Sequence, residues 1–279
     1  MLSKGLLSKA LKAAKRNAIP LGVGAGILGA GVMSTASASD DCIPPPHQSW
    51  THKGAFNSFD AASMRRGYEV YRQVCSTCHA MNFLCYRNLV GNTHTKEHAE
   101  MLAGSIEVKD GPNDEGEMFD RPGKLFDRFP APYPNAEAAR AANGGAYPPD
   151  LSMIVKARPH GEDYVFALLT GYKEAPAGIQ MRPGLHYNPY FSGGAISMEA
   201  PLKFQGQVEW QDGTPATVTQ MAKDVSVFLA WASEPETDDR KKAGVKWMTA
   251  LFVAAGIAGY WKRFKWMPIK TRRIEYKSY

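Results

Sequence analysis

The chain has only four cysteines, no acidic residue among its first 39 positions and no internal repeat. Four cysteines, at positions 42, 75, 78 and 85, are too few for a disulfide scaffold. The sequence also has no recognisable general-base or nucleophile arrangement, which argues against an enzyme that transforms a bound substrate. Its 279 residues exceed one average domain and predict one globular unit with appendages.

Positive charge is scarce in the middle of the chain, although the whole sequence carries +6. Residues 40–239 contain 17 basic and 26 acidic side chains, a net charge of −9, whereas residues 1–39 and 262–279 are basic. A folded domain of negative charge is a poor ligand for nucleic-acid phosphates. The same charge suits a basic protein partner, because complementary charges raise the rate of encounter.

The amino-terminal residues have the pattern of a targeting sequence. Residues 1–16 place leucine and alanine at helical spacing with lysines between them, and residues 18–33 are apolar and glycine-rich. The triplet Ala36-Ser37-Ala38 then resembles a processing site. We expect a cleavable presequence over residues 1–39 that directs the chain to the mitochondrial intermembrane space. A bacterial signal peptide and a retained membrane helix are the alternatives.

A second apolar stretch, residues 244–261, is interrupted only by Lys246. As a helix it would span about 27 Å, enough for a bilayer core if Lys246 extends its ammonium to the interface. Tryptophan and tyrosine near its ends fit an interfacial belt. We predict a transmembrane anchor over residues 240–262 and a basic tail, residues 263–279, on the matrix or cytoplasmic side. A buried helix of a globular core is the alternative.

The motif Cys75-Ser76-Thr77-Cys78-His79 carries the chemistry. Two thiols two residues apart can form thioethers to one porphyrin, and the following histidine can bind its iron, as in c-type haem attachment. A redox dithiol would be expected after a strand, but a helical segment, residues 60–74, precedes this motif. Half of a zinc site would need a second ligand pair, and none appears at suitable spacing.

The attachment motif together with helical periodicity predicts an all-α, mono-haem cytochrome c-type domain with long loops over residues 40–239. In such a fold the first helix, residues 60–74, would cross the last, residues 215–232, where Gly67 permits close approach; two unrelated amphipathic helices are the alternative. Further short helices are expected at residues 95–106, 135–142, 150–158 and 162–170. Residues 107–134 and 172–215 read as long loops, with a small β-hairpin starting at residues 204–210.

The sixth iron ligand is ambiguous from spacing alone. A methionine thioether favours Fe(II) and raises the reduction potential, which suits an electron carrier. Three methionines lie in loops rich in glycine and proline and could reach a haem: Met118, Met181 and Met198. Met64, Met153 and Met221 fall in helical patterns and read as packing residues. The competing histidine ligands are His94, His98, His160 and His186.

Several short stretches, taken in order, resemble the cytochrome c1 family, the haem subunits of cytochrome bc1 complexes. Matching pieces are residues 65–67, 86–91, 110–113, 116–119, 121–124, 139–143, 148–152, 161–165, 188–191, 213–217 and 265–266. The resemblance implies that Cys75, Cys78 and His79 hold haem c, that Met198 is the sixth ligand and that Arg121 meets a haem propionate. Cys42 and Cys85 depart from the family pattern and are either paired or free thiols.

The resemblance further implies a subunit of ubiquinol–cytochrome c oxidoreductase, itself an electron carrier. It would take electrons from the Rieske iron–sulfur protein and pass them to soluble cytochrome c. Cytochrome b would be a further partner, in a dimeric complex of the mitochondrial inner membrane with the haem domain in the intermembrane space. The rival functions are a haem enzyme or gas sensor with an open sixth position, and a membrane cytochrome of another oxidase or reductase.

Overall fold

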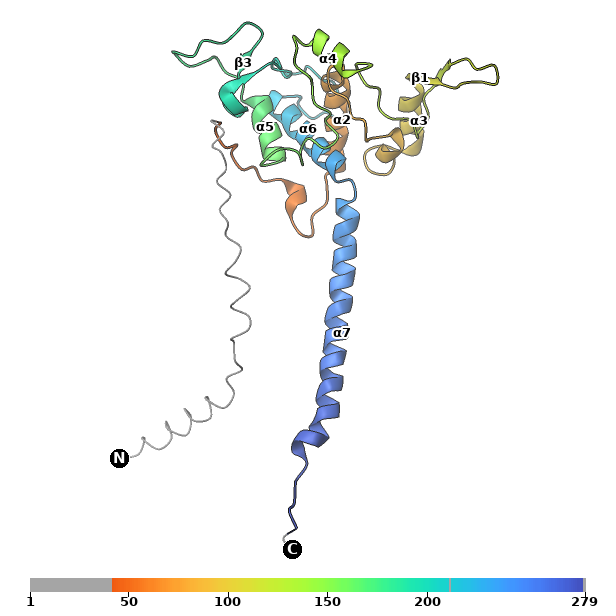
Figure 1. Ribbon diagram of the computed structural model, residues 1–279, viewed down its shortest axis with the longest axis vertical. Coiled ribbons are helices and arrows are strands. Elements are labelled where there is room, and N and C mark those ends of the chain that lie inside the picture. The colour runs from red at the N-terminus through yellow and green to blue at the C-terminus, as the bar shows by residue number, and fades with distance from the viewer. Residues whose placement is uncertain (1–41, 211, 278–279) are drawn as a thin grey trace. The chain divides into compact units, whose positions relative to one another are not determined.

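The computed structural model describes residues 42–210 and 212–277. The expected presequence, residues 1–39, lies outside the described residues. The described chain is mostly helical and contains four short strands in two separate two-stranded ribbons. This agrees with the expected all-α class (Figure 1).

Two helices far apart in the sequence form the centre of the domain, α2 (Ala61–Gln73) and α6 (Val218–Ser233). Asp60 caps α2 and Thr217 caps α6 through hydrogen bonds to backbone amides, as expected for helix starts. The two helices pack closely at Gly67, where an added Cβ would lie 2.1 Å from the carbonyl oxygen of Asp224. The expected crossing with glycine at the contact is therefore confirmed.

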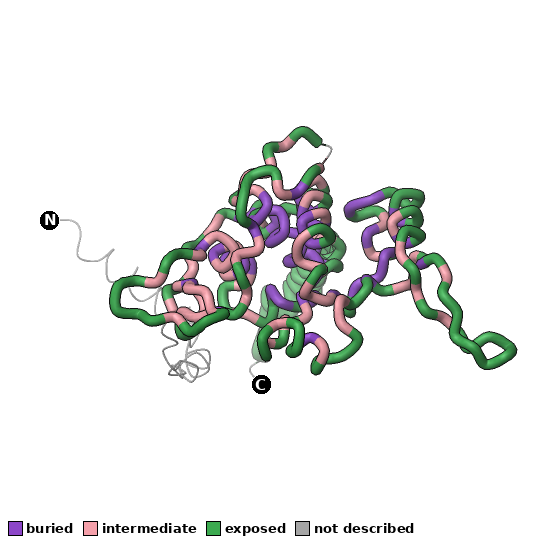
Figure 2. The backbone as a smooth tube through the Cα atoms, turned by 90° about the horizontal axis from the view of Figure 1, so that it is seen from above, coloured by how far each residue is buried: buried purple, intermediate pink, exposed green. Residues whose placement is uncertain are grey.

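Aromatic side chains fill the space around this crossing. Tyr68 and Tyr71 from α2 meet Phe228 from α6, and Phe129 packs against both tyrosines. Phe228 is fully buried, and Trp231 is nearly so. Figure 2 shows buried residues gathered along the central helices, while the outer loops are exposed. Burial of these large apolar surfaces is the main source of stability of the domain.

Shorter elements surround the two central helices. They are η1 (Thr51–Lys53), η2 (Cys75–Thr77), η3 (Tyr86–Leu89), α3 (Lys96–Gly104), α4 (Ala136–Ala142), α5 (Glu162–Thr170) and η4 (Ser192–Gly194). Of the four short helices expected from the sequence, α3, α4 and α5 are present with their predicted caps or starts. The fourth prediction was wrong, because residues 150–158 form turns.

The strands form where the sequence indicated only loops. Strand β1 (Glu107–Asp110) pairs antiparallel with β2 (Phe119–Pro122), and β3 (His186–Tyr187) pairs antiparallel with β4 (Ala195–Ile196). The expected hairpin at residues 204–210 is absent, and this segment forms turns. Its backbone bonds go elsewhere: Lys203 N–H donates to the Gln207 side chain and Gly206 N–H donates to the Ala216 carbonyl.

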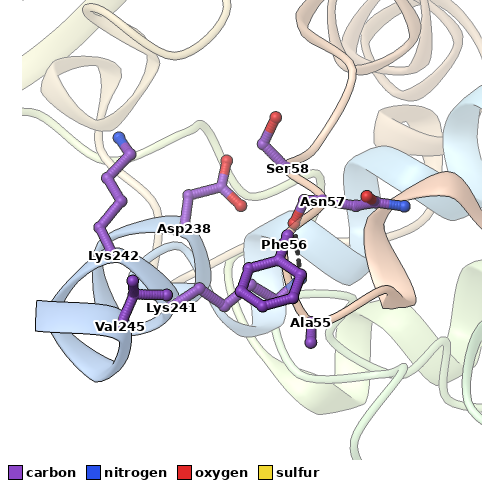
Figure 3. A pocket seen from close by; sticks show the side chains of 8 residues that line it. All are labelled: Ala55, Phe56, Asn57, Ser58, Asp238, Lys241, Lys242 and Val245. Carbon is purple, nitrogen blue, oxygen red and sulfur yellow. Dashed lines mark hydrogen bonds between the residues drawn. The ribbon is translucent and has the colours of Figure 1, made fainter. Parts of the chain in front are cut away.

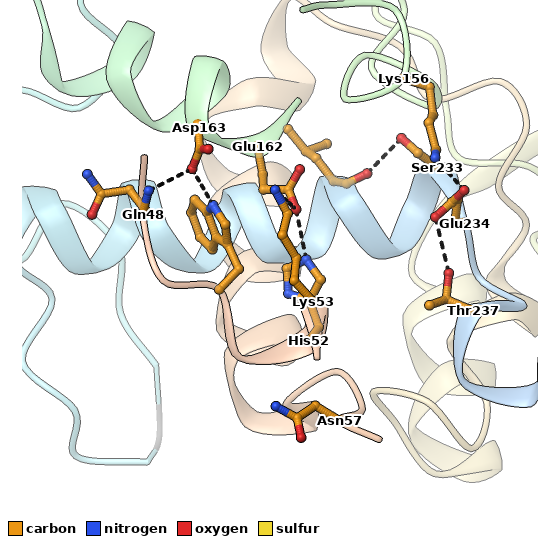
Figure 4. A network of polar contacts seen from close by, with 12 residues as sticks. Gln48, His52, Lys53, Asn57, Lys156, Glu162, Asp163, Ser233, Glu234 and Thr237 are labelled. Carbon is orange, nitrogen blue, oxygen red and sulfur yellow. Dashed lines mark hydrogen bonds and ion pairs between the residues drawn. The ribbon is translucent and has the colours of Figure 1, made fainter. Parts of the chain in front are cut away.

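A polar network holds the first described segment against α5 (Figure 4). The Trp50 indole donates to Asp163 at 2.5 Å, and His52 Nε2 lies 3.0 Å from Glu162 Oε1. Lys53 adds an ion pair to Glu162 at 3.2 Å. Both carboxylates sit in the first turn of α5, where negative charge is favoured by the helix dipole.

The last helix, α7 (Thr237–Thr271), follows α6 after a break at Glu234. Glu234 precedes Pro235 and adopts a non-helical conformation, because a following proline disfavours helical backbone. Only Thr237 of α7 is buried, and by length and composition the helix could cross a membrane. It continues past the predicted end of the anchor at residue 262 and includes Pro268.

Candidate haem-attachment site

The Cys75–His79 motif folds as a tight turn directly after α2. Within it, η2 begins at Cys75, and the amides of Cys78 and His79 both donate to the Cys75 carbonyl, at 3.2 and 2.9 Å. The turn therefore brings the two thiols and the imidazole onto one short stretch of backbone. This is the donor set that c-type haem attachment requires.

The His79 imidazole is oriented by backbone groups. Its Nδ1 atom lies 2.8 Å from the Pro149 carbonyl oxygen, so Nδ1 carries the proton and Nε2 keeps its lone pair. The Tyr71 hydroxyl donates to the His79 carbonyl at 3.2 Å. Burial lowers the pKa of His79, which favours the neutral, metal-binding form of the ring. These residues fit a haem iron bound through Nε2.

The alternatives for the cysteine pair find no support. Burial raises the pKa of the Cys75 thiol to about 12, whereas the nucleophilic cysteine of a redox dithiol has a lowered pKa. Among the described residues, no group of three or more His, Cys, Asp or Glu side chains is placed to hold a metal ion. The raised pKa of the Cys75 thiol argues against a redox dithiol at this pair.

Met198, the expected sixth ligand, lies two residues after β4 on a segment with two tertiary attachments. The Tyr172 hydroxyl donates to the Met198 carbonyl at 3.1 Å. Asn188 is fully buried between β3 and η4, and its side chain donates to the Leu168 carbonyl of α5 at 2.8 Å. The two contacts hold the Met198 segment against α5 and against Tyr172, two residues beyond the end of that helix. Met198 itself is partly exposed.

The other methionines differ in setting. Met64 and Met221 are buried on α2 and α6, which confirms them as packing residues. Met153 was expected to be one as well, but it is 44% exposed on a turn. Met118 is exposed on the loop between β1 and β2, and Met181 is partly exposed.

The competing histidines have varied surroundings. His94 is buried against the rings of Tyr68 and His98, and it hydrogen-bonds to Thr93 at 2.8 Å. Burial lowers the pKa of His94 to about 4, and packing alone accounts for its position. His160 lies in a groove with residues at the start of α7. His98 is exposed, and His186 on β3 pairs with Ile196.

Arg121, the expected propionate partner, is held by two carboxylates. It lies on β2, forms an ion pair with Asp110 on β1, and forms two hydrogen bonds to Asp127 at 2.7 and 3.0 Å. These bonds lower the pKa of both carboxyl groups. Among the described contacts, one N–H of Nη2 remains for a further acceptor. These ion pairs therefore also fit a purely structural role, in which Arg121 links β2 to β1 and to Asp127.

The two remaining cysteines, Cys42 and Cys85, are both unpaired. Cys85 is buried in the core region, and its amide donates to the Asn88 side chain at 2.8 Å. Cys42 is partly exposed beside Ile43, whose amide donates to the Pro189 carbonyl. The free-thiol alternative is therefore the one observed.

Sequence reasoning missed the groups that orient the site. The Pro149 carbonyl has no side-chain signature, and Asn188 and Tyr172 are linked to their partners only by folding. Tyr71 is a partial exception, since it lies four residues before Cys75 and so on the same helical face.

Comparison with known proteins gives the family. The profile of the Cytochrome C1 family matches residues 50–269. The chain is 55% identical over 255 residues to "Cytochrome c1 2, heme protein, mitochondrial" of Arabidopsis thaliana, covering 90% of this chain and 83% of the relative. It is 54% identical over 241 residues to the "Cytochrome b-c1 complex catalytic subunit, mitochondrial" of Candida albicans, covering 86% and 83%. It is 51% identical over 239 residues to the cytochrome c1 of Saccharomyces cerevisiae, covering 85% and 77%. On these matches, the chain belongs to the cytochrome c1 family.

Proposed function

We propose that this chain is the haem-bearing electron-transfer subunit of mitochondrial complex III, the ubiquinol–cytochrome c oxidoreductase. The observation that carries this proposal is the turn at Cys75–His79, with His79 Nδ1 fastened to the Pro149 carbonyl at 2.8 Å and Nε2 left free. Membership of the cytochrome c1 family and the mitochondrial names of the relatives support it.

The chain's own residues bind and orient one haem c. Cys75 and Cys78 would form the thioethers to the haem, and His79 Nε2 and Met198 would bind its iron. The haem supplies reversible one-electron transfer between Fe(III) and Fe(II). A soft thioether ligand favours Fe(II) and raises the potential, which suits a carrier that accepts electrons from a high-potential donor. Tyr172 and Asn188 support this role by holding the ligand segment.

Arg121 is proposed to contribute one N–H to a haem propionate while it stays paired with Asp110 and Asp127. Its guanidinium has five donors in a rigid fork, so it can bind several acceptors at once. The side chain is 13% exposed, which limits competition from water.

The proposed electron path runs from the Rieske iron–sulfur protein to this haem and on to soluble cytochrome c. Cytochrome b is the membrane partner, and the complex is dimeric. Residues 1–39 are the removed presequence, the haem domain lies in the intermembrane space, and the tail after residue 262 lies in the matrix. The seven basic side chains of residues 262–279 support this orientation through the positive-inside rule.

The test is a redox-controlled absorption spectrum of the full haem-loaded chain and its Met198→Leu variant. We expect the parent to be six-coordinate and the variant to lose the methionine-to-iron band with a sharp drop in potential. Met118→Leu and Met181→Leu are matched controls that should leave both unchanged. An unchanged Met198→Leu spectrum would reject this ligand, and a parent that binds carbon monoxide readily would indicate an open-site haem enzyme or sensor.

The partner proposal has a test of its own. If the net charge of −9 steers a basic cytochrome c, the bimolecular rate of its reduction should fall steeply as ionic strength rises. A rate independent of salt would reject steering while leaving the haem ligands untouched.

A further inference from the structure

The loop between η1 and α2 exposes a phenylalanine beside the anchor helix. Phe56 in this loop is 87% exposed, more than any other phenylalanine among the described residues. A single exposed apolar side chain is common on protein surfaces and carries no argument alone. The position of this one relative to α7 is what distinguishes it.

Three hydrogen bonds fasten the loop and the preceding helix η1 to the first turns of α7. Lys241 Nζ donates to the carbonyls of His52 and Asn57, at 2.5 and 2.8 Å, and the Phe59 amide donates to Asp238 at 3.2 Å. Loop and helix together line a hollow of about 120 Å³, where the Lys241 side chain reaches from α7 toward Phe56 (Figure 3). Its lining includes Phe56 from the loop and Val245 from α7. The loop is therefore held at a defined level along the helix.

That level coincides with the edge of the membrane-crossing segment. Val245 is the second residue of the apolar stretch 244–261, so the helix enters the hydrocarbon core at about this residue. Lys241 and Lys242 lie three to four residues earlier, about 5 Å along the helix axis, and the headgroup layer is about 5–7 Å thick. Phe56, which shares the hollow with both lysines and Val245, is placed at the same depth.

Two basic side chains beside Phe56 are available to lipid phosphate, while the Asp238 carboxylate of the same hollow accepts from the Phe59 amide. Within the described chain, Lys241 has no carboxylate partner, and two of its three N–H groups are used by backbone carbonyls. Lys242 is largely exposed, and its nearest carboxylate, Asp239, is 3.7 Å away and itself exposed. Aromatic rings beside basic side chains are a favoured combination at the bilayer interface.

We propose that the Phe56 loop, together with Lys241 and Lys242, is a second, interfacial membrane contact of this chain. The phenyl ring enters the boundary between headgroups and acyl chains, and the two ammonium groups meet lipid phosphates. The partner is a phospholipid bilayer, which the transmembrane helix already brings to this level. This contact adds to the transmembrane helix in holding the haem domain at a fixed level above the membrane.

The experiment introduces the Phe56→p-benzoylphenylalanine substitution into the full chain in its native membrane. On irradiation, the excited ketone takes a hydrogen atom from a neighbouring C–H group, and the two carbon radicals join in a covalent bond. Phe252→p-benzoylphenylalanine in the membrane-crossing stretch is the positive control, and Phe83→p-benzoylphenylalanine, 70% exposed after the haem motif, is the negative one. Mass spectrometry should detect phospholipid adducts at positions 56 and 252 and none at 83. Adducts of position 56 with a protein subunit, or none while position 252 reacts, would overturn the proposal.

The lysines have a separate test in vesicles of phosphatidylcholine with added anionic phosphatidylglycerol. The Lys242→Glu substitution should lower the share of anionic lipid among the position-56 adducts by about two- to fivefold. Lys109→Glu on the exposed strand β1 is the matched control and should leave that share unchanged. An unchanged share in Lys242→Glu would reject the headgroup contact. Neither experiment depends on Met198, so each can fail while the proposed electron-transfer function stands.

Discussion

Helices α6 and α7 follow one another in the chain, separated by three residues, yet they have opposite surroundings. Of the 16 residues of α6, 12 are buried in the protein, whereas only Thr237 is buried among the 35 of α7. Both helices contain long apolar stretches, so apolar content by itself does not decide which partner a helix takes.

The two helices differ in the number of polar side chains they contain and in whether neighbouring residues hydrogen-bond to them. Helix α6 buries Asp224, Ser226 and Ser233, and each has a hydrogen-bond acceptor or donor within the domain. The apolar stretch of α7 carries one charge, Lys246, and its large side chains point outward on all sides. A helix in protein can bury polar groups because neighbours satisfy them, but a helix in lipid has almost no such neighbours.

Substituting an aspartate should give the largest difference between the two helices in the free energy of unfolding. Asp224 is fully buried and binds Ser63 Oγ at 2.5 Å, Arg66 Nε at 2.7 Å and Gln220 Nε2 at 2.9 Å. The Asp224→Ala substitution leaves the largely buried Arg66 with one carboxylate fewer and should lower the free energy of unfolding by about 3–5 kcal/mol. Urea titration followed by tryptophan fluorescence measures it.

The matched control is Asp239→Ala on α7. Asp239 is exposed in the first turn of α7 and forms an ion pair with Lys242 at 3.7 Å, so the expected loss is at most about 1 kcal/mol. Equal losses of unfolding free energy in Asp224→Ala and Asp239→Ala would contradict this prediction, because they would mean that burial of the charge does not affect stability.

A smaller effect is expected at the glycines. The Gly67→Ala substitution places a Cβ 2.1 Å from the Asp224 carbonyl oxygen and 2.7 Å from the Phe228 Cβ, so α2 and α6 must move apart. Overpacking of this kind costs about 1–3 kcal/mol of unfolding free energy. The Gly256→Ala substitution in α7 has no described neighbour within 4 Å and should be neutral or slightly stabilising. Thermal unfolding of both variants compares them, and a neutral Gly67→Ala would contradict the close helix contact.

The smallest effect concerns Glu234, which lies between the two helices. Partial burial raises the pKa of Glu234, but its ion pairs with Lys156 and Arg240 outweigh this and bring the pKa below its usual value. Because the folded pKa is depressed, the stabilisation is present above the unfolded value of about 4.3 and is lost as the pH falls through the folded pKa.

The Glu234→Gln substitution should therefore cost up to about 1 kcal/mol at neutral pH and reduce the loss of stability on acidification below pH 4. Unfolding free energies measured from pH 3 to 7 give this slope. Glu100→Gln, an exposed residue paired with Lys96 at 3.8 Å on α3, is the control that should keep the parent's slope. An unaltered slope in Glu234→Gln would show that the junction carries no pH-dependent ion pair.

Local patterns predicted much of the fold. Helix α5 occupies the residues expected from its periodicity, and Thr95 and Asn135 cap α3 and α4 as expected. Gly67 was rightly placed at the contact of the first and last helices, because helical spacing puts it on one face with Tyr71 and Cys75. These predictions depend on neighbours in the sequence, and local geometry decides them.

One failed prediction has its cause in long-range hydrogen bonds. In the expected helix at residues 150–158, the Leu151 amide donates to the Ala80 carbonyl and the Asp150 carboxylate accepts from the Asn82 amide. These bonds fasten the segment beside the haem motif and replace a helical start. The expected hairpin is replaced by local bonds instead: the Trp210 indole donates to the Thr214 carbonyl, four residues later, at 2.5 Å.

The sequence by itself determined the attachment motif and the anchor, because both follow from short-range spacing. Two thiols and a histidine within five residues match the pattern of haem attachment, and an apolar run of 18 residues is long enough to cross a bilayer. Only the tertiary structure decided that the Pro149 carbonyl orients His79, that Tyr172 and Asn188 hold the Met198 segment, and that Lys241 binds the Phe56 loop. Those contacts join residues separated by 20 to 184 positions, and such pairs meet only when burial of the core has brought their elements together.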